Sequence, residues 1–246
     1  MIIKRLTPEN GPISHADRVH AYLKERLLEG GLEPGDALST EQISAALNVS
    51  RSPVMEALKR LEAEGFIQVF PQVGSRVIHP DPDEVADFYR LFAANEAVIA
   101  ELAAERRSAE EARNYARIVK EVASAANKAG SYSSRDPQYR ILNRRRYDAM
   151  HQLAHSRVAS ELAAAMWDRA DFYSRIAFGS IYFAKWVREL QARLDKAISR
   201  SDGGAAKATV YALLMRAGEL ISEELKEKSK ATQAAQQRWK AERQRV

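Results

Sequence analysis

Two serines flank one arginine near the start of a predicted helix, and these three side chains are suited to contacting DNA. Ser50, Arg51 and Ser52 place short hydroxyls around a guanidinium. A guanidinium can donate two hydrogen bonds to a guanine edge, and hydroxyls can donate to phosphate oxygens. Such groups reach the bases when their helix enters a major groove. The triplet predicts a DNA contact with Arg51 as its principal residue.

Two short helices are predicted to position the triplet. Residues 38–47 form an amphipathic segment that Ser39 can cap, and Asn48 closes it before a second helix begins near residue 50. Apolar side chains at helical spacing give each segment one buried face: Ile43, Leu47, Val54 and Leu58. Two helices joined by a three- to four-residue turn predict a helix-turn-helix.

The stretch after Gly65 predicts a small wing. Residues 66–77 alternate apolar and polar side chains on either side of a turn over residues 71–74, in which Gly74 can take a positive φ. A helix-turn-helix followed by such a β-hairpin is a winged helix. We expect the wing tip to offer Gln72, Ser75 and Arg76 to the DNA backbone or minor groove.

A first helix and two connecting segments complete this half. The helix is expected from about 14 to 29, with Val19, Tyr22, Leu23 and Leu27 on its buried side. Residues 1–14 are interpreted as a loose arm and 15–78 as the DNA-binding domain. Residues 79–82 form a short stiff linker, because each of its two prolines restricts itself and the residue before it.

Composition argues against several classes of protein. The 246 residues suffice for two modest domains, and the chain contains no cysteine, which excludes disulfides and thiolate metal sites. We find no secretory signal, no apolar run long enough to span a membrane, no phosphate-binding loop and no nucleophile elbow. These features favour a cytoplasmic, non-enzymatic protein that needs no cofactor.

The net charge of +5 does not come from the predicted DNA-binding half of the chain. Residues 1–80 contain nine Lys or Arg and ten Asp or Glu, whereas residues 226–246 contain seven basic and two acidic residues. DNA affinity must therefore come from the placement of a few cations, which dimerisation would double. We treat residues 229–246 as a basic tail that forms a frayed helix or no fixed structure.

Helical patterns dominate the second half. Helices are expected near 83–106, 108–129, 135–155, 157–177, 181–200 and 203–228, joined by short connections. Such a pattern predicts a six-helix antiparallel bundle over residues 83–228. The predicted fold is thus mainly α, with an N-terminal winged helix-turn-helix and a C-terminal helical bundle.

The pattern of residues 18–77 resembles the DNA-binding domain of GntR-family bacterial transcription regulators. The shared positions are Pro34-Gly35, Leu38, Val49 to Val54, Glu56-Ala57-Leu58, Arg60-Leu61, Gly65 and Gly74. Two positions depart from the family. Many members have arginine at Met55, one turn after Arg51, and members with large helical C-terminal domains have glutamate at Thr40. The resemblance implies an operator that differs from the family's commonest one.

The second half resembles the helical effector-binding and dimerisation domain of the FadR branch, the FCD type, and six helices imply its VanR-like subgroup. Glu96 with residues 100–106 matches the first helix of that domain. Members commonly hold a divalent metal with one aspartate and three histidines. The alignment places Arg144, Asp148 and Gln191 at three of these positions, so we expect no bound metal.

Three interpretations of this region stay open. Arg144, or its neighbours Arg145 and Arg146, could hold an acidic effector in place of the metal, with Asp148, His151, Gln191 and Phe92 as further effector-binding residues. Asp148, His151 and His155 lie on one face of one helix and could instead ligate a metal. In the third, Arg144 simply pairs with Asp148. Phe92 stands where the family tends to have arginine, which together with the aromatic side chains of the later helices permits an apolar or aromatic effector.

The sequence therefore predicts a homodimeric, ligand-responsive transcription regulator that binds a pseudo-palindromic DNA operator, most simply as a repressor released by a small metabolite. Two rival hypotheses belong to other classes. A metal-dependent or hydrolytic enzyme built on the bundle would turn over a substrate without DNA. An architectural DNA-binding protein would bind DNA regardless of any metabolite.

Overall fold

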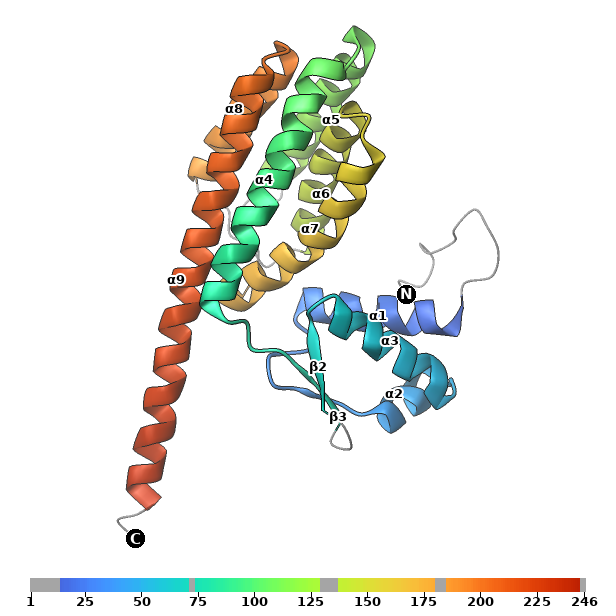
Figure 1. Ribbon diagram of the computed structural model, residues 1–246, viewed down its shortest axis with the longest axis vertical. Coiled ribbons are helices and arrows are strands. Elements are labelled where there is room, and N and C mark those ends of the chain that lie inside the picture. Colours follow the sequence, from blue (N-terminus) through green and yellow to red (C-terminus); the bar gives the residue numbers. More distant parts are fainter. Residues whose placement is uncertain (1–13, 71–73, 129–136, 180–184, 244–246) are drawn as a thin grey trace. The chain divides into compact units, whose positions relative to one another are not determined.

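A computed structural model describes residues 14–70, 74–128, 137–179 and 185–243 (Figure 1). The chain divides into two compact units, residues 1–79 and 80–246. Within the described residues, no helix is both long and apolar enough to cross a membrane.

The first unit is a helix-turn-helix with a small sheet. Helix α1 spans His15–Glu29, α2 spans Thr40–Leu47 and α3 spans Arg51–Ala63. Strands β1 (Ala37–Leu38), β2 (Ile67–Phe70) and β3 (Gly74–Val77) form an antiparallel sheet in the order β1-β3-β2. The predicted hairpin is β2–β3. Strand β1 adds a third strand that was not predicted, because two residues are too few to show an alternating pattern. The winged helix-turn-helix prediction is confirmed.

Local capping explains where the first two helices begin and end. The Ser14 hydroxyl accepts a hydrogen bond from the Asp17 amide at the start of α1, and Ser39 accepts one from the Gln42 amide at the start of α2. Asn48 ends α2 in the left-handed region, with φ of 51°. Asparagine tolerates this conformation better than most residues, so the chain can turn sharply into α3.

The core of this unit lies between α1, α3 and the sheet. Its buried apolar side chains are Val19, Leu23, Leu27, Val54, Leu58, Leu61, Phe66, Ile67 and Val77. The prediction that Tyr22 is buried was wrong: it is 38% exposed, and the Arg26 guanidinium lies 5.9 Å from its ring centroid. Ile43 and Leu47 are only half-buried, because the short α2 covers the core incompletely.

A polar cluster joins the end of α3 to α1. Glu64, just after α3, contacts His20 Nε2 and Lys24 Nζ, each at 2.8 Å. Burial alone would raise the pKa of Glu64, but the bonds from His20 and Lys24 outweigh this effect and lower it to about 2. The ionised carboxylate therefore ties the third helix to the first at neutral pH.

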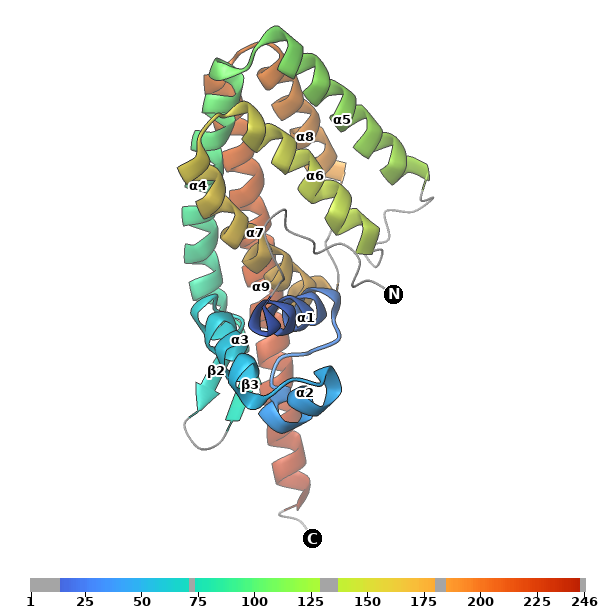
Figure 2. The same cartoon turned by 90° about the vertical axis from the view of Figure 1, so that its right-hand side faces the viewer.

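The second unit is a helical bundle (Figures 1 and 2). In its described residues, it contains α4 (Pro82–Arg106), α5 (Ala109–Lys128), α6 (Pro137–Leu153), α7 (Arg157–Phe178), α8 (Lys185–Ser199) and α9 (Gly203–Arg243). Asp81 caps α4 by accepting from the amides of Asp83 and Glu84, with Pro82 at the first helical position. The prediction of a mainly α fold with a C-terminal helical bundle is confirmed.

Helices α4 and α9 run side by side in the bundle (Figures 1 and 2). Gly218 of α9 allows this approach: a Cβ atom there would lie 2.4 Å from Cβ of Tyr89. Next to this contact, Phe88, Tyr89 and Phe92 pack edge-on or stacked with one another, and Phe92 packs edge-on against Trp167 of α7 at 5.0 Å. Aromatic side chains thus fill the space between α4 and α7.

The end of α9 differs from the expected boundary. We expected the last bundle helix to end near residue 228, but α9 continues to Arg243. Its last buried apolar side chain is Leu225 among the residues whose burial is described, and residues 226–231 are all exposed. The basic segment is therefore a continuation of α9 in secondary structure.

Candidate DNA-binding face and effector pocket

The start of α3 is exposed and retains its donors. Ser50 is the N-cap residue, but its hydroxyl makes no capping hydrogen bond. Ser50, Arg51 and Ser52 are all exposed, and Arg51 is the first helical residue. The first amides of a helix lack intrahelical acceptors and carry its positive dipole end. The free amides at the start of α3 can therefore bind a phosphate, and the side chains of Ser50, Arg51 and Ser52 lie around them.

Arg51 has one partner in the free protein. Its Nη2 lies 3.2 Å from Oε1 of Glu41 on α2, and its side chain is 72% exposed. An ion pair this exposed contributes little to stability, because water and salt screen it. The pair links α2 to the first residue of α3.

Met55 and Thr40 contact each other across the turn. The Thr40 hydroxyl donates to Sδ of Met55 at 3.4 Å, and Met55 is 40% exposed. Both lie where the resemblance marked departures from the family. Threonine and methionine thus form a neutral contact at two positions where the resembled family commonly has glutamate and arginine. The exposed methionine can therefore offer apolar contact to a groove but cannot donate a hydrogen bond.

The wing contributes less than expected. Arg76 is exposed, but its Nη1 donates to the carbonyl of Gly35 at 3.1 Å, which ties the side chain to the base of the sheet. Gly74 has the expected positive φ, 119°, with open space around its Cα. The expectation that Ser75 is offered to DNA was wrong, because it is buried between β1 and β2. Gln72 lies outside the described residues.

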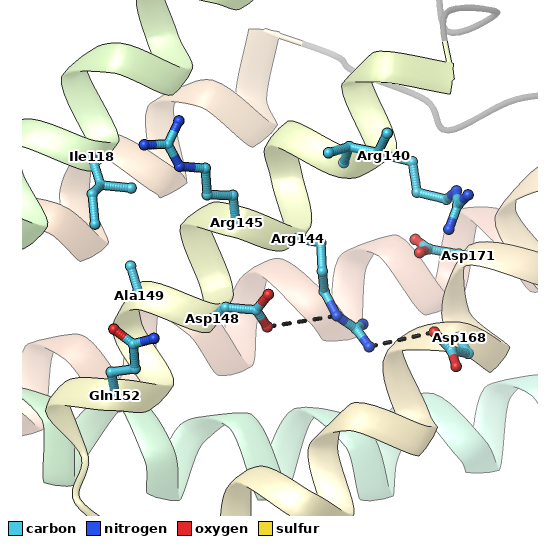
Figure 3. A pocket seen from close by; sticks show the side chains of 10 residues that line it. Ile118, Arg140, Arg144, Arg145, Asp148, Ala149, Gln152, Asp168 and Asp171 are labelled. Carbon is cyan, nitrogen blue, oxygen red and sulfur yellow. Dashed lines mark hydrogen bonds and ion pairs between the residues drawn. The ribbon is translucent and has the colours of Figure 1, made fainter. Parts of the chain in front are cut away.

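A pocket of about 490 Å³ opens between α5, α6 and α7 (Figure 3). Its lining carries three arginines and three aspartates together with a few apolar and neutral side chains. The lining residues are Ile118 of α5, Arg140, Ile141, Arg144, Arg145, Asp148, Ala149 and Gln152 of α6, and Asp168 and Asp171 of α7. The volume suits a small metabolite. Its charges are mixed, which is unusual for a site that selects a simple anion.

Arg144 lies at the centre of this pocket (Figure 3). Its Nη2 donates to the carbonyl of Ala164 at 2.9 Å and lies 3.4 Å from Oδ1 of Asp168. Its Nε is 3.7 Å from Asp148, the partner expected from helical spacing, but that carboxylate is 56% exposed. Nη1 is buried and has no hydrogen-bond partner among the described residues. One donor of the central guanidinium is therefore unsatisfied.

Asp171 supplies the matching acceptor. Its side chain lines the pocket, the residue is only 8% exposed, and it makes no hydrogen bond or ion pair within the part of the chain that the structure describes. Burial raises the pKa of Asp171 to about 7, although the charges of Arg144 and Arg140 oppose this rise. A largely buried carboxyl that is half-ionised near neutral pH and lines a pocket is a candidate for ligand binding.

Three predicted effector residues do not line this pocket. Phe92 is fully buried in the aromatic cluster of α4. His151 is buried with Nε2 2.9 Å from Oε1 of Glu96, which also accepts from Trp167 Nε1 at 2.7 Å. Gln191 donates to Asn143 at 3.3 Å inside the bundle. The structure therefore brings only Arg144 and Asp148 of the predicted set together.

The alternative metal ligands do not converge. His151 faces Glu96, whereas His155 lies 3.1 Å from Glu111 on α5, and Asp148 faces Arg144. Within the described residues, no group of three or more His, Asp or Glu side chains is placed to hold a metal ion. Of the three interpretations of this region, the single-helix metal site receives no support from the geometry.

Comparison with known proteins identifies the first unit. The sequence profile of "Bacterial regulatory proteins, gntR family" matches residues 15–77. The chain carries a GntR-family DNA-binding domain. The expectations of DNA binding and of a non-enzymatic regulator are confirmed by this match together with the relatives below.

Similar proteins match different lengths of this chain. An HTH-type transcriptional regulator in an unstable DNA locus of Streptomyces ambofaciens is 44% identical over 78 residues, 32% of this chain and 33% of that protein. The match thus spans one third of that relative. The regulator YdhC of Bacillus subtilis is 22% identical over 201 residues, 82% of this chain and 88% of that protein.

The fold of the whole chain is also found among solved structures. The structure of McbR/YncC of Escherichia coli aligns with a TM-score of 0.67 at 20% identity, covering 87% of this chain and 99% of that one. At this identity the likeness concerns the fold alone. It shows that a winged helix-turn-helix domain followed by a helical bundle is a known fold, and it leaves the VanR-like subgroup a prediction.

Sequence reasoning missed four charged residues of these two sites. Asp168 and Asp171 are three residues apart, and Arg140 precedes Arg144 by four, so each pair shares one helix face. That spacing was visible, but which two faces meet depends on the pairing of α6 with α7. Glu41 was likewise visible in α2, yet its approach to Arg51 depends on the angle between two short helices.

Proposed function

We propose that the chain is a homodimeric repressor that leaves its operator when a small charged metabolite occupies the α5–α6–α7 pocket. The observation that carries this proposal is the pairing of two features in one chain: an exposed α3 start with Arg51, and a cavity in the helical unit whose central arginine has an unsatisfied donor. Its place of action is the bacterial cytoplasm, where the chromosome lies.

DNA readout would rest on the start of α3. Arg51 donates to a guanine edge, while Ser50, Ser52 and the helix amides hold a phosphate. Met55 and Thr40 form a neutral patch beside Arg51 and favour apolar contact there. Arg76 and Gly74 place the wing along the DNA backbone, and Gln72, outside the described residues, stays a sequence-based candidate for the same contact.

Two copies would read a pseudo-palindromic operator, and the bundle offers a surface for their pairing. Leu91 and Val98 of α4 and Val158 and Leu162 of α7 are exposed apolar side chains. Asn95 contacts Met166, and Arg106 donates to the Ala154 carbonyl, so α4 and α7 run antiparallel in a register that brings Val98 close to Leu162. A continuous apolar face of this kind fits a second copy of the same face about a two-fold axis.

Dimerisation is tested by placing a charge on that face. Leu162→Asp should shift the sedimentation of the purified protein from dimer to monomer, because burying an unpaired carboxylate in an apolar interface is costly. Arg157→Glu at an exposed α7 position beside the face serves as a control for added negative charge. A dimer that persists in the Leu162 variant would place the interface elsewhere.

The pocket ligand would act by differential affinity. A metabolite that binds one arrangement of the dimer more tightly than the other shifts the population toward it, and no catalysis is needed. The proposal as a whole is tested by mapping the genomic sites that the protein binds and adding metabolites of the neighbouring pathway to one bound fragment. Release by one of them is the expected result, and binding that ignores all of them supports the architectural alternative.

A further inference from the structure

We infer that the pocket ligand is zwitterionic, carrying a carboxylate that binds Arg144 and an ammonium group that binds Asp171. This inference rests on the proposed function, because it names the chemical class of the ligand for the same pocket. It goes beyond an acidic effector, and the experiment below separates the two.

The first argument is hydrogen bonding. Within the described residues, the pocket contains a buried donor without an acceptor, Nη1 of Arg144, and a largely buried carboxyl, Asp171, on which the charges of Arg144 and Arg140 act. An unsatisfied buried polar group costs free energy, and a ligand that satisfies it recovers that cost. A carboxylate satisfies only Arg144, and an amine satisfies only Asp171. A ligand that carries both groups satisfies the two sites together.

The second argument is charge. The three arginines of the pocket are balanced by three aspartates, and Arg144 already lies 3.4 Å from Asp168 and 3.7 Å from Asp148. A simple anion bound to Arg144 would enter beside these carboxylates and be repelled by them. An attached ammonium group offsets this repulsion. The mixed lining is therefore complementary to a molecule that is itself neutral overall.

The third argument is the placement of the two groups. Arg140 and Arg144 share one face of α6, and Asp168 and Asp171 share one face of α7, so the two faces oppose each other across the pocket (Figure 3). Arg144 is the strongest of the cations that act on Asp171. Arg144 and Asp171 thus face the same small cavity from two different helices, as the two ends of a bound amino acid require.

The ionisation of Asp171 makes the inference measurable. Burial raises its pKa to about 7, and the groups that act on it are Arg140 and Arg144 from α6, Asp168 on α7, and Tyr89 from α4. An ammonium group binds the ionised carboxylate, so binding expels a proton when Asp171 begins neutral. The ionised fraction rises from about one tenth at pH 6 to about nine tenths at pH 8, and affinity should rise about tenfold with it.

The experiment is a titration of the purified full chain with matched sets of ligands. The zwitterions are the protein amino acids, β-alanine and 4-aminobutanoate, screened by thermal shift. For each one that binds, calorimetry compares it with its desamino carboxylate and its decarboxylated amine, such as phenylalanine, 3-phenylpropanoate and 2-phenylethylamine. We expect at least one zwitterion to bind at least tenfold more tightly than either partner, with proton release that grows as the pH falls below 7.

Two substitutions locate the ammonium site. Asp171→Asn keeps the shape of the side chain and removes its charge, and it should weaken zwitterion binding more than tenfold and abolish the pH dependence. Binding of the desamino carboxylate should stay equal or tighten. Asp148→Asn, the same change at the exposed carboxylate of the pocket, should alter zwitterion affinity less than threefold.

Each other outcome overturns the inference in a distinguishable way. If desamino carboxylates bind as tightly as the zwitterions and release operator DNA, the protein has no ammonium-binding site, and the proposed function stands. If Asp171→Asn leaves zwitterion binding unchanged, Asp171 does not bind the ammonium group. A protein that neither binds nor responds to any zwitterion or carboxylate of the set would overturn both proposals.

Discussion

Nη2 of Arg51 lies 3.2 Å from Oε1 of Glu41, so the arginine that we place in the major groove is paired with α2 before DNA arrives. The pair links the two helices of the helix-turn-helix at their exposed ends. It keeps Arg51 over the start of α3, which reduces the number of side-chain arrangements that binding must exclude. It also places a carboxylate close to where a phosphate would lie.

Replacing Arg51 tests direct readout. Arg51→Ala should weaken specific operator binding more than tenfold, about 1.4 kcal/mol, since one charge-assisted contact to a base edge is lost. Lys59→Ala, which removes an exposed charge further along α3, should cost less and affect all sequences alike. Gel-shift titrations at fixed salt measure both, and equal losses in the two variants would remove Arg51 from its role.

Replacing Glu41 tests the pair itself. Glu41→Gln frees the Arg51 guanidinium and removes an anion near the phosphates, so DNA binding should tighten between about 1.5- and fivefold, as expected for an exposed pair. The salt dependence of binding should steepen slightly. Weaker binding in fluorescence anisotropy would instead show that Glu41 is needed to orient Arg51.

The exposed side chains at the start of α3 were predictable from sequence because they depend on local structure. Ser39 caps the start of α2 and Asn48 ends it, so both bounds of the helix before Ser50 and Arg51 can be read from the sequence. The first turn of α3 is exposed because its first buried residue is Val54. Tyr22 shows the limit of this reasoning, because it lies at the edge of the helical stripe that contains Leu23, where spacing alone does not decide burial.

The pocket could be predicted only in part, because it depends on how distant helices pair. Arg144 was found through its position in a known helical pattern. Asp171 was not, since a carboxylate 27 positions later becomes its neighbour only when α7 packs on α6. His151 and Phe92 lie on the predicted helices, but their faces turn toward Glu96 and Trp167 in the core.

Metal content gives a direct prediction. Purified protein should carry no stoichiometric divalent ion, because Arg144 occupies a position where the related domains hold a ligand and its guanidinium repels cations. Elemental analysis after removal of any affinity tag measures this. One zinc, nickel or manganese per chain would contradict it, and the histidines at 151 and 155 would be the first residues to replace.

Asp171 predicts a pH dependence of stability. Its pKa is raised from 3.8 to about 7, so the folded state binds this proton more tightly than the unfolded state. The free energy of unfolding should therefore fall as pH rises from about 4 to 7, by a few kcal/mol at most, and change little from this source outside that window. Asp171→Asn should lose this dependence and be more stable than the native protein at pH 8. Parallel melting curves of the two proteins that show the same pH dependence would contradict this.

The central claim is that the pocket controls DNA binding through Arg144, and operator release by ligand tests it most directly. Fluorescence anisotropy of a labelled operator follows release as zwitterionic and carboxylate metabolites are added to the native protein and to Arg144→Ala. Arg113→Ala, an exposed arginine of α5 outside the pocket lining, is the control. We predict that all three proteins bind the operator with the same affinity, and that the metabolite which releases the native protein and the control leaves Arg144→Ala bound. Release of Arg144→Ala at the concentrations that release the native protein would contradict the account.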